Sequence, residues 1–150
     1  MIRIQEADFD LSTEIANLRK GDLQVGAVVS FLGTVRDLNE GSEVHSMTLE
    51  HYPGMTEKAL EAIVSQAKAR WDIRNTLIIH RVGSLKPEDQ IVLVAVTSAH
   101  RAEAFAACEF MMDYLKTAAP FWKKEETAEG GRWVDARVAD DAAMARWKKT

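Results

Sequence analysis

The feature that most constrains the fold is a pair of strand-like apolar runs separated by a very short turn. The runs are TLIIHRVG (76–83) and DQIVLVAVTSA (89–99), and the turn between them is KPED. A second pair, FWKKEET (121–127) and RWVDARV (132–138), is joined across AEGG. Parallel neighbours need a crossover of about a dozen residues or more, so both short connections favour antiparallel pairing.

Other segments with a two-residue period predict further strands. They are Ile2–Gln5, expected at an edge, VGAVVSFLGTVRD (25–37) and HSMTLEHY (45–52). Gly26 and Gly33 interrupt the long segment and indicate a bulge, or a place where another group approaches the backbone closely. The segment between the last two strands, LNEGSE (38–43), is typical of a polar loop.

Three segments with a helical period complete the prediction. LSTEIANLRKG (11–21) ends at Gly21, and its apolar face is formed by Leu11, Ile15 and Leu18. A helix of roughly 18 residues follows Pro53-Gly54; its expected face is Met55, Ala59, Ile63, Ala67 and Trp71. The third runs from about His100 to Thr117, with Ser98 as N-cap and Ala119-Pro120 as its end. The sequence therefore predicts an α+β fold with a largely antiparallel sheet and three main helices.

Size and composition limit the protein classes that fit. With 150 residues, 47% hydrophobic and 28% charged, the chain is predicted to form a single domain (1–150) with a charged tail at about 139–150. A net charge of -4 argues against nucleic-acid binding. The single cysteine excludes an internal disulfide and favours the cytoplasm. The N-terminus has no export signal, and the longest apolar run, IVLVAV (91–96), is too short to cross a membrane.

The stretch MDYLKTAAPFWKKE (112–125) sets three lysines among apolar residues. At 100° per residue, Lys116 falls at the border of a helix face that also carries Phe105, Cys108 and Met112. One interpretation is a lysine whose stem covers the core while its amine reaches water. The other is a partly desolvated amine with a lowered pKa, suited to acid–base or nucleophilic chemistry. Helical phase alone does not decide between them.

The lysines of the following strand are separated by its two-residue period. Lys123 faces the same way as Phe121, whereas Lys124 faces the opposite way with Trp122. At most one of the two adjacent lysines can therefore share a site with Lys116.

Further candidate residues carry positive charge or metal-ligand chemistry. His100 and Arg101 of SAHR (98–101) lie at a predicted helix start, where free N–H groups bind anions, and a surface basic pair is the plain alternative. Arg36 is a further cation, at the end of a strand. Cys108 is expected to be a packing residue. His45, His51 and His80 lack metal-ligand spacing, so we expect neither a metal nor a cofactor.

Taken together, these motifs resemble the large, catalytic subunit of molybdopterin synthase. The resemblance covers the chain from about Gly26 to Trp147, in order. The segments that carry it are FLGTVRD (31–37), LEHYPGMTEKAL (49–60), HRVG (80–83), VTSAHRAEAF (96–105), MDYLKTAAPFWKKE (112–125) and RWVDAR (132–137). It implies an α/β hammerhead fold and a homodimer within a heterotetramer.

The resemblance also implies an activity and partners. A small ubiquitin-like subunit, ending in a Gly-Gly thiocarboxylate, would donate two sulfurs in succession to cyclic pyranopterin monophosphate and so form the dithiolene of molybdopterin. The implied catalytic residues are Lys116 and Lys123. The implied substrate-binding residues are Arg36, His100, Arg101, Phe31, Met112 and Arg137. Both substrates are anions, so a site lined by cations fits their chemistry.

Two other functions stay open at this point. The chain could be a non-catalytic docking module for a ubiquitin-fold sulfur carrier, with lysines that only pair with the carrier's terminal carboxylate. Alternatively, Cys108 could carry a persulfide in a different sulfurtransferase. The apolar phase of Cys108 on its helix argues against the second function.

Overall fold

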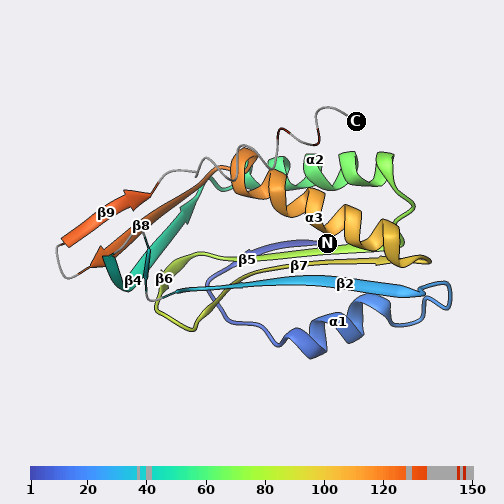
Figure 1. Cartoon of the computed structure of the whole chain (residues 1–150), viewed down its shortest axis with the longest axis horizontal. Coiled ribbons are helices and arrows are strands. Elements are labelled where there is room, and N and C mark those ends of the chain that lie inside the picture. The colour runs from blue at the N-terminus through green and yellow to red at the C-terminus, as the bar shows by residue number, and fades with distance from the viewer. Residues whose placement is uncertain (37, 40–41, 128–129, 135–144, 146, 148–150) are drawn as a thin grey trace.

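The computed structural model describes residues 1–36, 38–39, 42–127, 130–134, 145 and 147. The strands of these residues form two sheets, and helices separate groups of strands along the chain (Figure 1). In order, the elements are β1 (Ile2–Gln5), α1 (Leu11–Arg19), β2 (Ala27–Thr34), β3 (Leu38–Asn39), β4 (Ser42–His51), α2 (Met55–Arg70), β5 (Asn75–Arg81), β6 (Gly83–Leu85), β7 (Gln90–Ser98), α3 (Arg101–Ala118), β8 (Phe121–Thr127) and β9 (Gly130–Val134).

The first sheet has the strand order β1-β5-β7-β2. Strands β5 and β7 pair antiparallel, with Ile78 opposite Val94, and β2 pairs antiparallel with the other side of β7. Only β1, at the edge, runs parallel to its neighbour β5. This arrangement confirms the predicted largely antiparallel sheet and the edge position of Ile2–Gln5.

The second sheet has the order β3-β4-β8-β9, with β6 also paired to β4. The hairpin of β8 and β9 confirms the predicted pairing across AEGG. Two predictions are wrong here. The loop expected at 38–43 contains β3 and the first residues of β4, and the strand expected at 76–83 is divided into β5 and β6. The division lies next to Gly83, which has a φ of 87° that a residue with a side chain rarely adopts.

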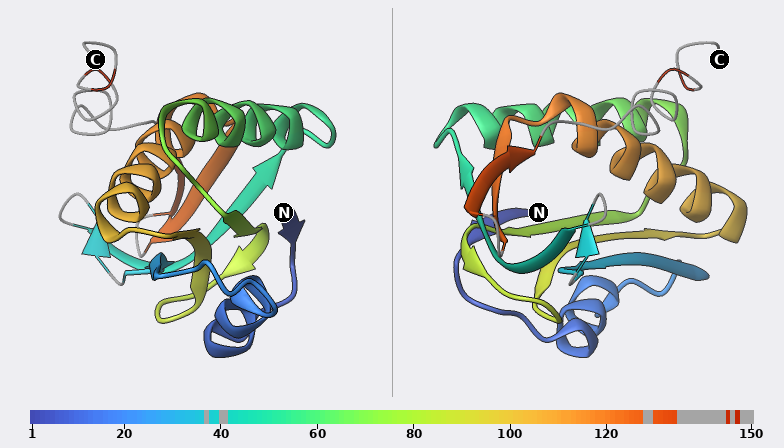
Figure 2. Two further views of the ribbon diagram at one scale, coloured as in Figure 1. Left: turned by 90° about the vertical axis from the view of Figure 1, so that its right-hand side faces the viewer. Right: turned by 60° about the vertical axis from the view of Figure 1, so that its left-hand side comes forward.

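The helices cover the two faces of the first sheet, α2 and α3 on one and α1 on the other (Figures 1 and 2). Successive residues of β5 and β7 point to opposite faces of the sheet, and both sets are hydrophobic, so both faces are apolar. The core under α2 and α3 is formed by Leu60, Ile63, Ala67, Ile78, Val92, Val94, Val96, Ala107, Cys108, Phe110, Met111, Met112 and Leu115. On the opposite face, Leu77, Ile79, Leu93 and Ala95 pack against Leu11, Ile15 and Leu18, as predicted for α1.

The buried faces of α2 and α3 are rotated from the predicted ones. Met55 and Phe105, both assigned to apolar faces, are each 62% exposed. In α2 the buried residues are Thr56, Leu60, Ile63 and Ala67. In α3 the buried face includes Ala104 and Ala107, whose small side chains give a weak hydrophobic signal in the sequence. The predicted faces were wrong because they included large hydrophobic residues that are exposed in the structure and left out small residues that are buried.

Several element ends differ from the prediction by one to three residues. Ser98 is the last residue of β7 rather than the N-cap of α3, and its hydroxyl accepts from the N–H of His100 at 3.3 Å. His100 is the N-cap. Strand β2 is shorter than the predicted 25–37. Gly26, just before it, lies so close to the carbonyl oxygen of Ala99 that a Cβ would stand 2.3 Å from it, which confirms the predicted close approach to the backbone. A register shift after Gly33 confirms the predicted bulge.

Candidate functional site

The two candidate catalytic lysines lie on either side of the joint between α3 and β8. Lys116 is in the last turn of α3, and Lys123 is in β8. Pro120 stops the helix between them, as predicted. The buried Thr56 of α2 fixes this joint: its hydroxyl donates to the carbonyl of Pro120 at 3.0 Å and accepts from the N–H of Tyr52 at 3.0 Å. Contacts from outside the joint thus set the path between the two lysines.

The alternation of β8 follows the prediction. Phe121 and Lys123 are half-buried on one face of the strand, whereas Trp122 is exposed on the other. The ring of Trp122 packs edge-on against Tyr52, with 4.5 Å between the ring centroids. The side chain of Lys124 lies outside the part of the chain that the structure describes, so its place in solvent stays a prediction.

Lys116 lies at the edge of the buried face of α3. Its side chain is exposed, but Leu115 beside it and Met112 one turn earlier are buried. The positive charge of Lys116 also helps to lower the pKa of the buried His80. The amine therefore acts electrostatically on the interior, a position that fits both a site residue and a lysine with a buried stem.

His80 is a site residue that the sequence reasoning missed. It lies on β5, and its ring is stacked on Phe121, with 3.8 Å between centroids and 17° between the ring planes. Burial lowers the pKa of His80 to about 4; the hydrogen bond to the Arg81 carbonyl opposes this shift, and the charges of Lys116 and His51 add to it. The signal was available: His80 has the parity of Ile78, whose side chain faces the core under α2 and α3.

Two residues implied by the resemblance come from or near β2, the strand that lies beside β7. Phe31 is opposite Val94 of β7 and is 40% exposed. Arg36 follows the end of β2 and is exposed. Strand β2 is packed under α3 (Figure 2), so Phe31 and the buried Met112 belong to adjoining elements. Arg36 therefore follows the end of a strand, as predicted, and its side chain is not packed in the core.

His100 and Arg101 do not join the two lysines within one chain. They lie at the first residues of α3, whereas Lys116 lies in its last turn. At a rise of about 1.5 Å per residue, the helix separates Arg101 from Lys116 by roughly 22 Å along its axis. Both residues at the helix start are exposed, as the alternative of a surface basic pair predicts. Within one chain, the implied cations therefore do not all lie together.

Arg137 lies outside the described residues, whereas Trp147 is one of them. Trp147 packs edge-on against Trp71 and Phe110, and its ring N–H donates to a carboxylate oxygen of Asp113 at 2.6 Å. Asp113 is three residues before Lys116 on the same helix. Trp147 thus lies beside the second half of α3.

Cys108 is a packing residue in this fold. It is buried between α3 and the first sheet, and burial raises the pKa of its thiol to about 11. A thiol that stays protonated is a poor nucleophile, which disfavours a persulfide-carrying function.

The described residues contain neither a candidate metal cluster nor a candidate membrane span. Among them, no cluster of His, Cys, Asp or Glu has a geometry that could hold a metal ion. Within the same residues, no helix combines the length and apolar character needed to cross a membrane.

The fold and the site define a class of α+β protein in which two lysines flank a joint between a helix and a strand. Over residues 4–118 the chain matches the family described as MoaE protein. It is 71% identical over 146 residues to the molybdopterin synthase catalytic subunit of Ralstonia nicotianae, covering 97% of this chain and 83% of that one. For the catalytic subunit of Pseudomonas aeruginosa the identity is 55% over 148 residues, covering 99% of each. The chain belongs to the MoaE family.

Solved structures agree with this assignment. The molybdopterin biosynthesis MoaE protein of Burkholderia ambifaria MC40-6 has a TM-score of 0.85 and 60% identity, covering 99% of this chain and 97% of that one. The molybdopterin synthase structure from Staphylococcus aureus has a TM-score of 0.81 and 33% identity, covering 88% and 95%. A complex of subunits 1 and 2 of molybdopterin-converting factor from Helicobacter pylori 26695, at 17% identity, TM-score 0.72 and coverages of 91% and 90%, shares the fold.

Proposed function

We infer that this chain is the sulfur-transferring subunit of a molybdopterin synthase and acts in molybdenum cofactor biosynthesis. The observation that carries the inference is the pair of lysines at the α3–β8 joint in a chain 71% identical to a molybdopterin synthase catalytic subunit. The proposed sulfur donor is the thiocarboxylated C-terminus of a small ubiquitin-like subunit. The proposed acceptor is cyclic pyranopterin monophosphate, and the product carries a dithiolene.

The residues of the joint suit this chemistry. Thiocarboxylate and phosphate are both anions, and a fixed ammonium group stabilises each of them. We assign Lys116 to the thiocarboxylate and Lys123 to proton transfer or substrate positioning, because Lys123 is the more enclosed of the two. The sulfur arrives on the partner, so the reaction needs no enzyme thiol. The buried, protonated state of Cys108 fits this route and the reducing cytoplasm in which we place the enzyme.

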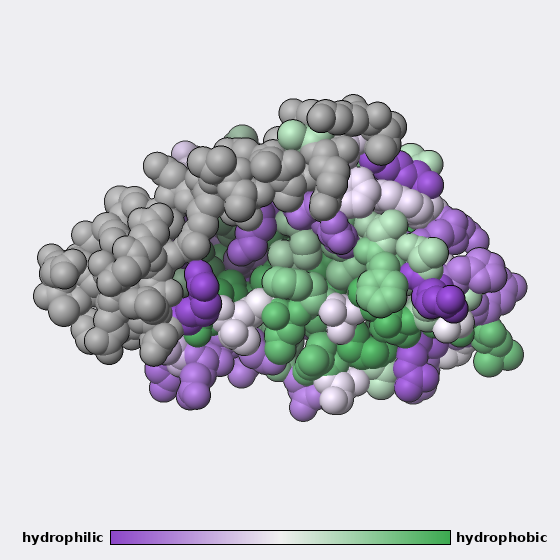
Figure 3. All heavy atoms as spheres, viewed as in Figure 1, coloured by the Kyte–Doolittle hydropathy of each residue, from purple (hydrophilic) through white to green (hydrophobic). Residues whose placement is uncertain are grey.

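A homodimer would resolve the separation of the cationic residues. His100 and Arg101 lie roughly 22 Å from Lys116 along α3, so they can serve the same site only if a second copy supplies them. Two features support self-association. Strand β2 is at an edge of its sheet, and Phe31 of β2 and Phe105 of α3 are exposed. A band of hydrophobic residues also crosses the face seen in Figure 3.

Partner assembly is the second part of the proposal. The Helicobacter pylori structure is a complex of two subunits of a molybdopterin-converting factor. We propose that this chain likewise binds a small subunit, one on each copy of the dimer, which gives a heterotetramer. Light scattering of the chain alone and with its partner tests both stoichiometries.

The test of the activity replaces each lysine with alanine and measures dithiolene formation with thiocarboxylated partner. Loss of acid–base or charge stabilisation is expected to lower turnover by on the order of a hundredfold or more for Lys116→Ala and Lys123→Ala. The matched control is Lys68→Ala, since Lys68 is an exposed lysine in the last turn of α2, roughly 18 Å along the helix from Thr56 at the joint. Near-wild-type turnover in both site variants would sink the assignment.

The same assay distinguishes an enzyme from a non-catalytic docking module. A module that only binds the carrier would retain partner affinity in the wild type but would never convert the pterin. Turnover by the wild type, lost in the lysine variants without loss of partner affinity, excludes that alternative.

A further inference from the structure

The ring of His80 is a buried titratable group that has no assigned function in the proposed mechanism. His80 is 6% exposed and lies on the face of β5 that is covered by α2 and α3. Its ring is stacked on Phe121, two residues before Lys123 on the same face of β8. The charge of Lys116 reaches the same ring. His80 therefore contacts the start of the strand that carries Lys123 and lies within electrostatic reach of Lys116.

The protonation pattern of the ring follows from its hydrogen bond. Nδ1 of His80 lies 2.8 Å from the carbonyl oxygen of Arg81, and a carbonyl oxygen can only accept, so Nδ1 carries the hydrogen. In the neutral ring, Nε2 is then a lone-pair acceptor. Burial keeps the ring neutral, because it lowers the pKa to about 4, with the charges of Lys116 and His51 acting in the same direction.

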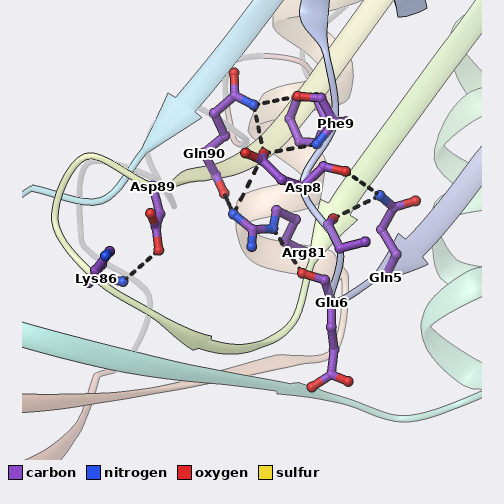
Figure 4. A network of polar contacts seen from close by, with 9 residues as sticks. Gln5, Glu6, Asp8, Phe9, Arg81, Lys86, Asp89 and Gln90 are labelled. Carbon is purple, nitrogen blue, oxygen red and sulfur yellow. Dashed lines mark hydrogen bonds and ion pairs between the residues drawn. The ribbon is translucent and has the colours of Figure 1, made fainter.

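The residue that orients the ring is itself held firmly (Figure 4). Nε of Arg81 donates to the carbonyl of Glu6 at 3.1 Å, and Nη1 donates to the carbonyl of Gln90 at 2.9 Å. Asp8 lies 3.7 Å from the same guanidinium. Two segments, residues 6–8 and the start of β7, therefore hold the side chain of Arg81, and its carbonyl oxygen orients the imidazole.

The other ring nitrogen has no such partner. Among the residues that the structure describes, no donor makes a hydrogen bond to Nε2 of His80. Nε2 is not among the fully enclosed unsatisfied atoms of the described residues, so it lies in the small solvent-exposed part of this side chain. A donor from outside the chain can therefore reach this acceptor and make the hydrogen bond that no described residue makes.

We propose that Nε2 of His80 accepts a hydrogen bond from an N–H group of the bound substrate, which makes His80 a further binding residue of this reaction. The inference rests on the proposed function. Two N–H sources would meet the site, the peptide N–H groups of the Gly-Gly tail and the N–H groups of the pterin. Lysine and arginine side chains donate only, so they cannot satisfy either one.

A neutral imidazole also suits a cationic site better than the alternatives. A carboxylate would accept the same hydrogen bond, but it would pair with Lys116 or Lys123 and cancel the charge that anionic substrates need. Imidazole supplies the acceptor without adding negative charge. Its stacking on Phe121 holds that acceptor at a fixed position relative to Lys123.

Three variants of His80 separate the acceptor from the other contacts of the ring. His80→Phe keeps an aromatic ring against Phe121 but has no lone pair. His80→Asn places its amide as far from Cβ as Nδ1 and so retains only the bond to Arg81. His80→Gln extends the amide to the distance of Nε2 and so restores the acceptor. His51→Gln is the matched control, since His51 is a half-buried histidine opposite Phe121.

Two binding constants are measured for each variant. One is the KM for the pterin at saturating thiocarboxylated partner, and the other is the Kd of the partner subunit with and without its last two glycines. We expect His80→Phe and His80→Asn to raise one of these constants by about tenfold, the effect of one lost hydrogen bond, with a smaller rise for His80→Gln and none for His51→Gln. A change confined to the Kd of the full-length tail assigns the donor to the tail, and a change in KM assigns it to the pterin.

The outcomes that overturn the inference are equally specific. Unchanged constants in His80→Phe and His80→Asn, or a loss in His80→Gln as large as in His80→Phe, would show that Nε2 accepts nothing from the substrate. Thermal unfolding at neutral pH checks that each variant folds, and the Asn–Gln pair keeps the test decisive if the Phe variant does not. A wild-type chain without turnover would refute the proposed function instead, whereas tail affinity would still report on His80.

Discussion

Helix α3 carries functional candidates at both ends, and the two ends are supported very differently. At its C-terminal end, the hydroxyl of Thr56 donates to Pro120 at 3.0 Å and the ring of His80 stacks on Phe121 at 3.8 Å. At its N-terminal end, His100 and Arg101 are exposed. There the hydroxyl of Ser98 accepts from the N–H of His100 at 3.3 Å, which positions the backbone but neither side chain.

This difference shows how the two ends can contribute to a site. A site held within about 0.5 Å of its productive geometry needs packed supporting residues, and the C-terminal end has them. Exposed side chains at the N-terminal end gain a fixed geometry only when another surface covers them. We therefore expect the C-terminal end to be formed in one chain and the N-terminal end to be completed by a second copy.

The strongest test of this comparison mixes two inactive variants. His100→Ala removes the N-terminal end, and Lys116→Ala removes the C-terminal end. If each site takes one end from each copy, half of a randomly mixed population is heterodimer with one intact site, so the mixture should regain about one quarter of the wild-type rate. Dithiolene formation after denaturing and refolding the mixture measures this gain. A mixture no more active than its components would mean that both ends serve the same chain or different functions.

A second test examines the burial of His80 at the C-terminal end. Its pKa is about 4 in the folded chain and 6.5 in the unfolded chain, so the unfolded state binds more protons between these values. The unfolded state therefore gains protons on His80 that the folded state does not bind. Above pH 6.5 this effect is absent, and the free energy of unfolding decreases as the pH falls towards 4. The expected loss is about 3 kcal/mol.

Urea unfolding at several pH values measures this loss. His80→Gln provides the reference, because glutamine does not titrate and the rest of the chain is unchanged. The wild type should lose more stability than the variant over the acidic range. Parallel pH profiles for the two proteins would contradict the buried, neutral state of His80.

A smaller effect is expected at Thr56, which fixes the joint between the two lysines. Thr56→Val keeps the shape but removes the hydroxyl that serves the carbonyl of Pro120 and the N–H of Tyr52. Leaving these groups without their partner should cost about 1–3 kcal/mol of unfolding free energy. Turnover should fall as well, because the path from Lys116 to Lys123 loosens. Thr34→Val, at an exposed position of β2, is the control and should leave both quantities unchanged.

The smallest effect is expected in the middle of α3, between the two functional ends. Cys108→Ser should retain full turnover, since the thiol is buried and burial raises its pKa to about 11. The serine hydroxyl can donate to the carbonyl of Val94, which lies 3.7 Å from the sulfur in the wild type. Loss of turnover in a folded Cys108→Ser protein would revive the persulfide-carrier function.

Much of the fold could be predicted from local patterns. The short connections KPED and AEGG required antiparallel pairs, and both pairs are present. What failed were features set by distant contacts. Strand β6 exists because β4 pairs with it, and the buried face of α3 follows small alanines that pack against the sheet rather than the larger Phe105. Periodicity weighs hydrophobicity along one element and carries no information about the surface that meets it.

The candidate site divides along the same line. The two-residue period placed Lys123 on the half-buried face of β8, and the resemblance identified the lysine pair. His80 was missed because its sequence neighbours describe only a strand. Its importance arises from Phe121, which is 41 positions away by residue number and lies 3.8 Å away by ring centroid.

The sequence by itself determined the α+β class, the helix stop at Pro120 and the separation of Lys123 from its neighbour Trp122, because dihedral limits and strand period act on adjacent residues. The tertiary structure alone decided which of these residues lie near one another. It placed His80 against Phe121, on the strand that carries Lys123, and it held His100 and Arg101 at the opposite end of α3 from Lys116. Distances across the fold depend on how elements pack, and packing is a property of pairs of surfaces that no single stretch of sequence contains.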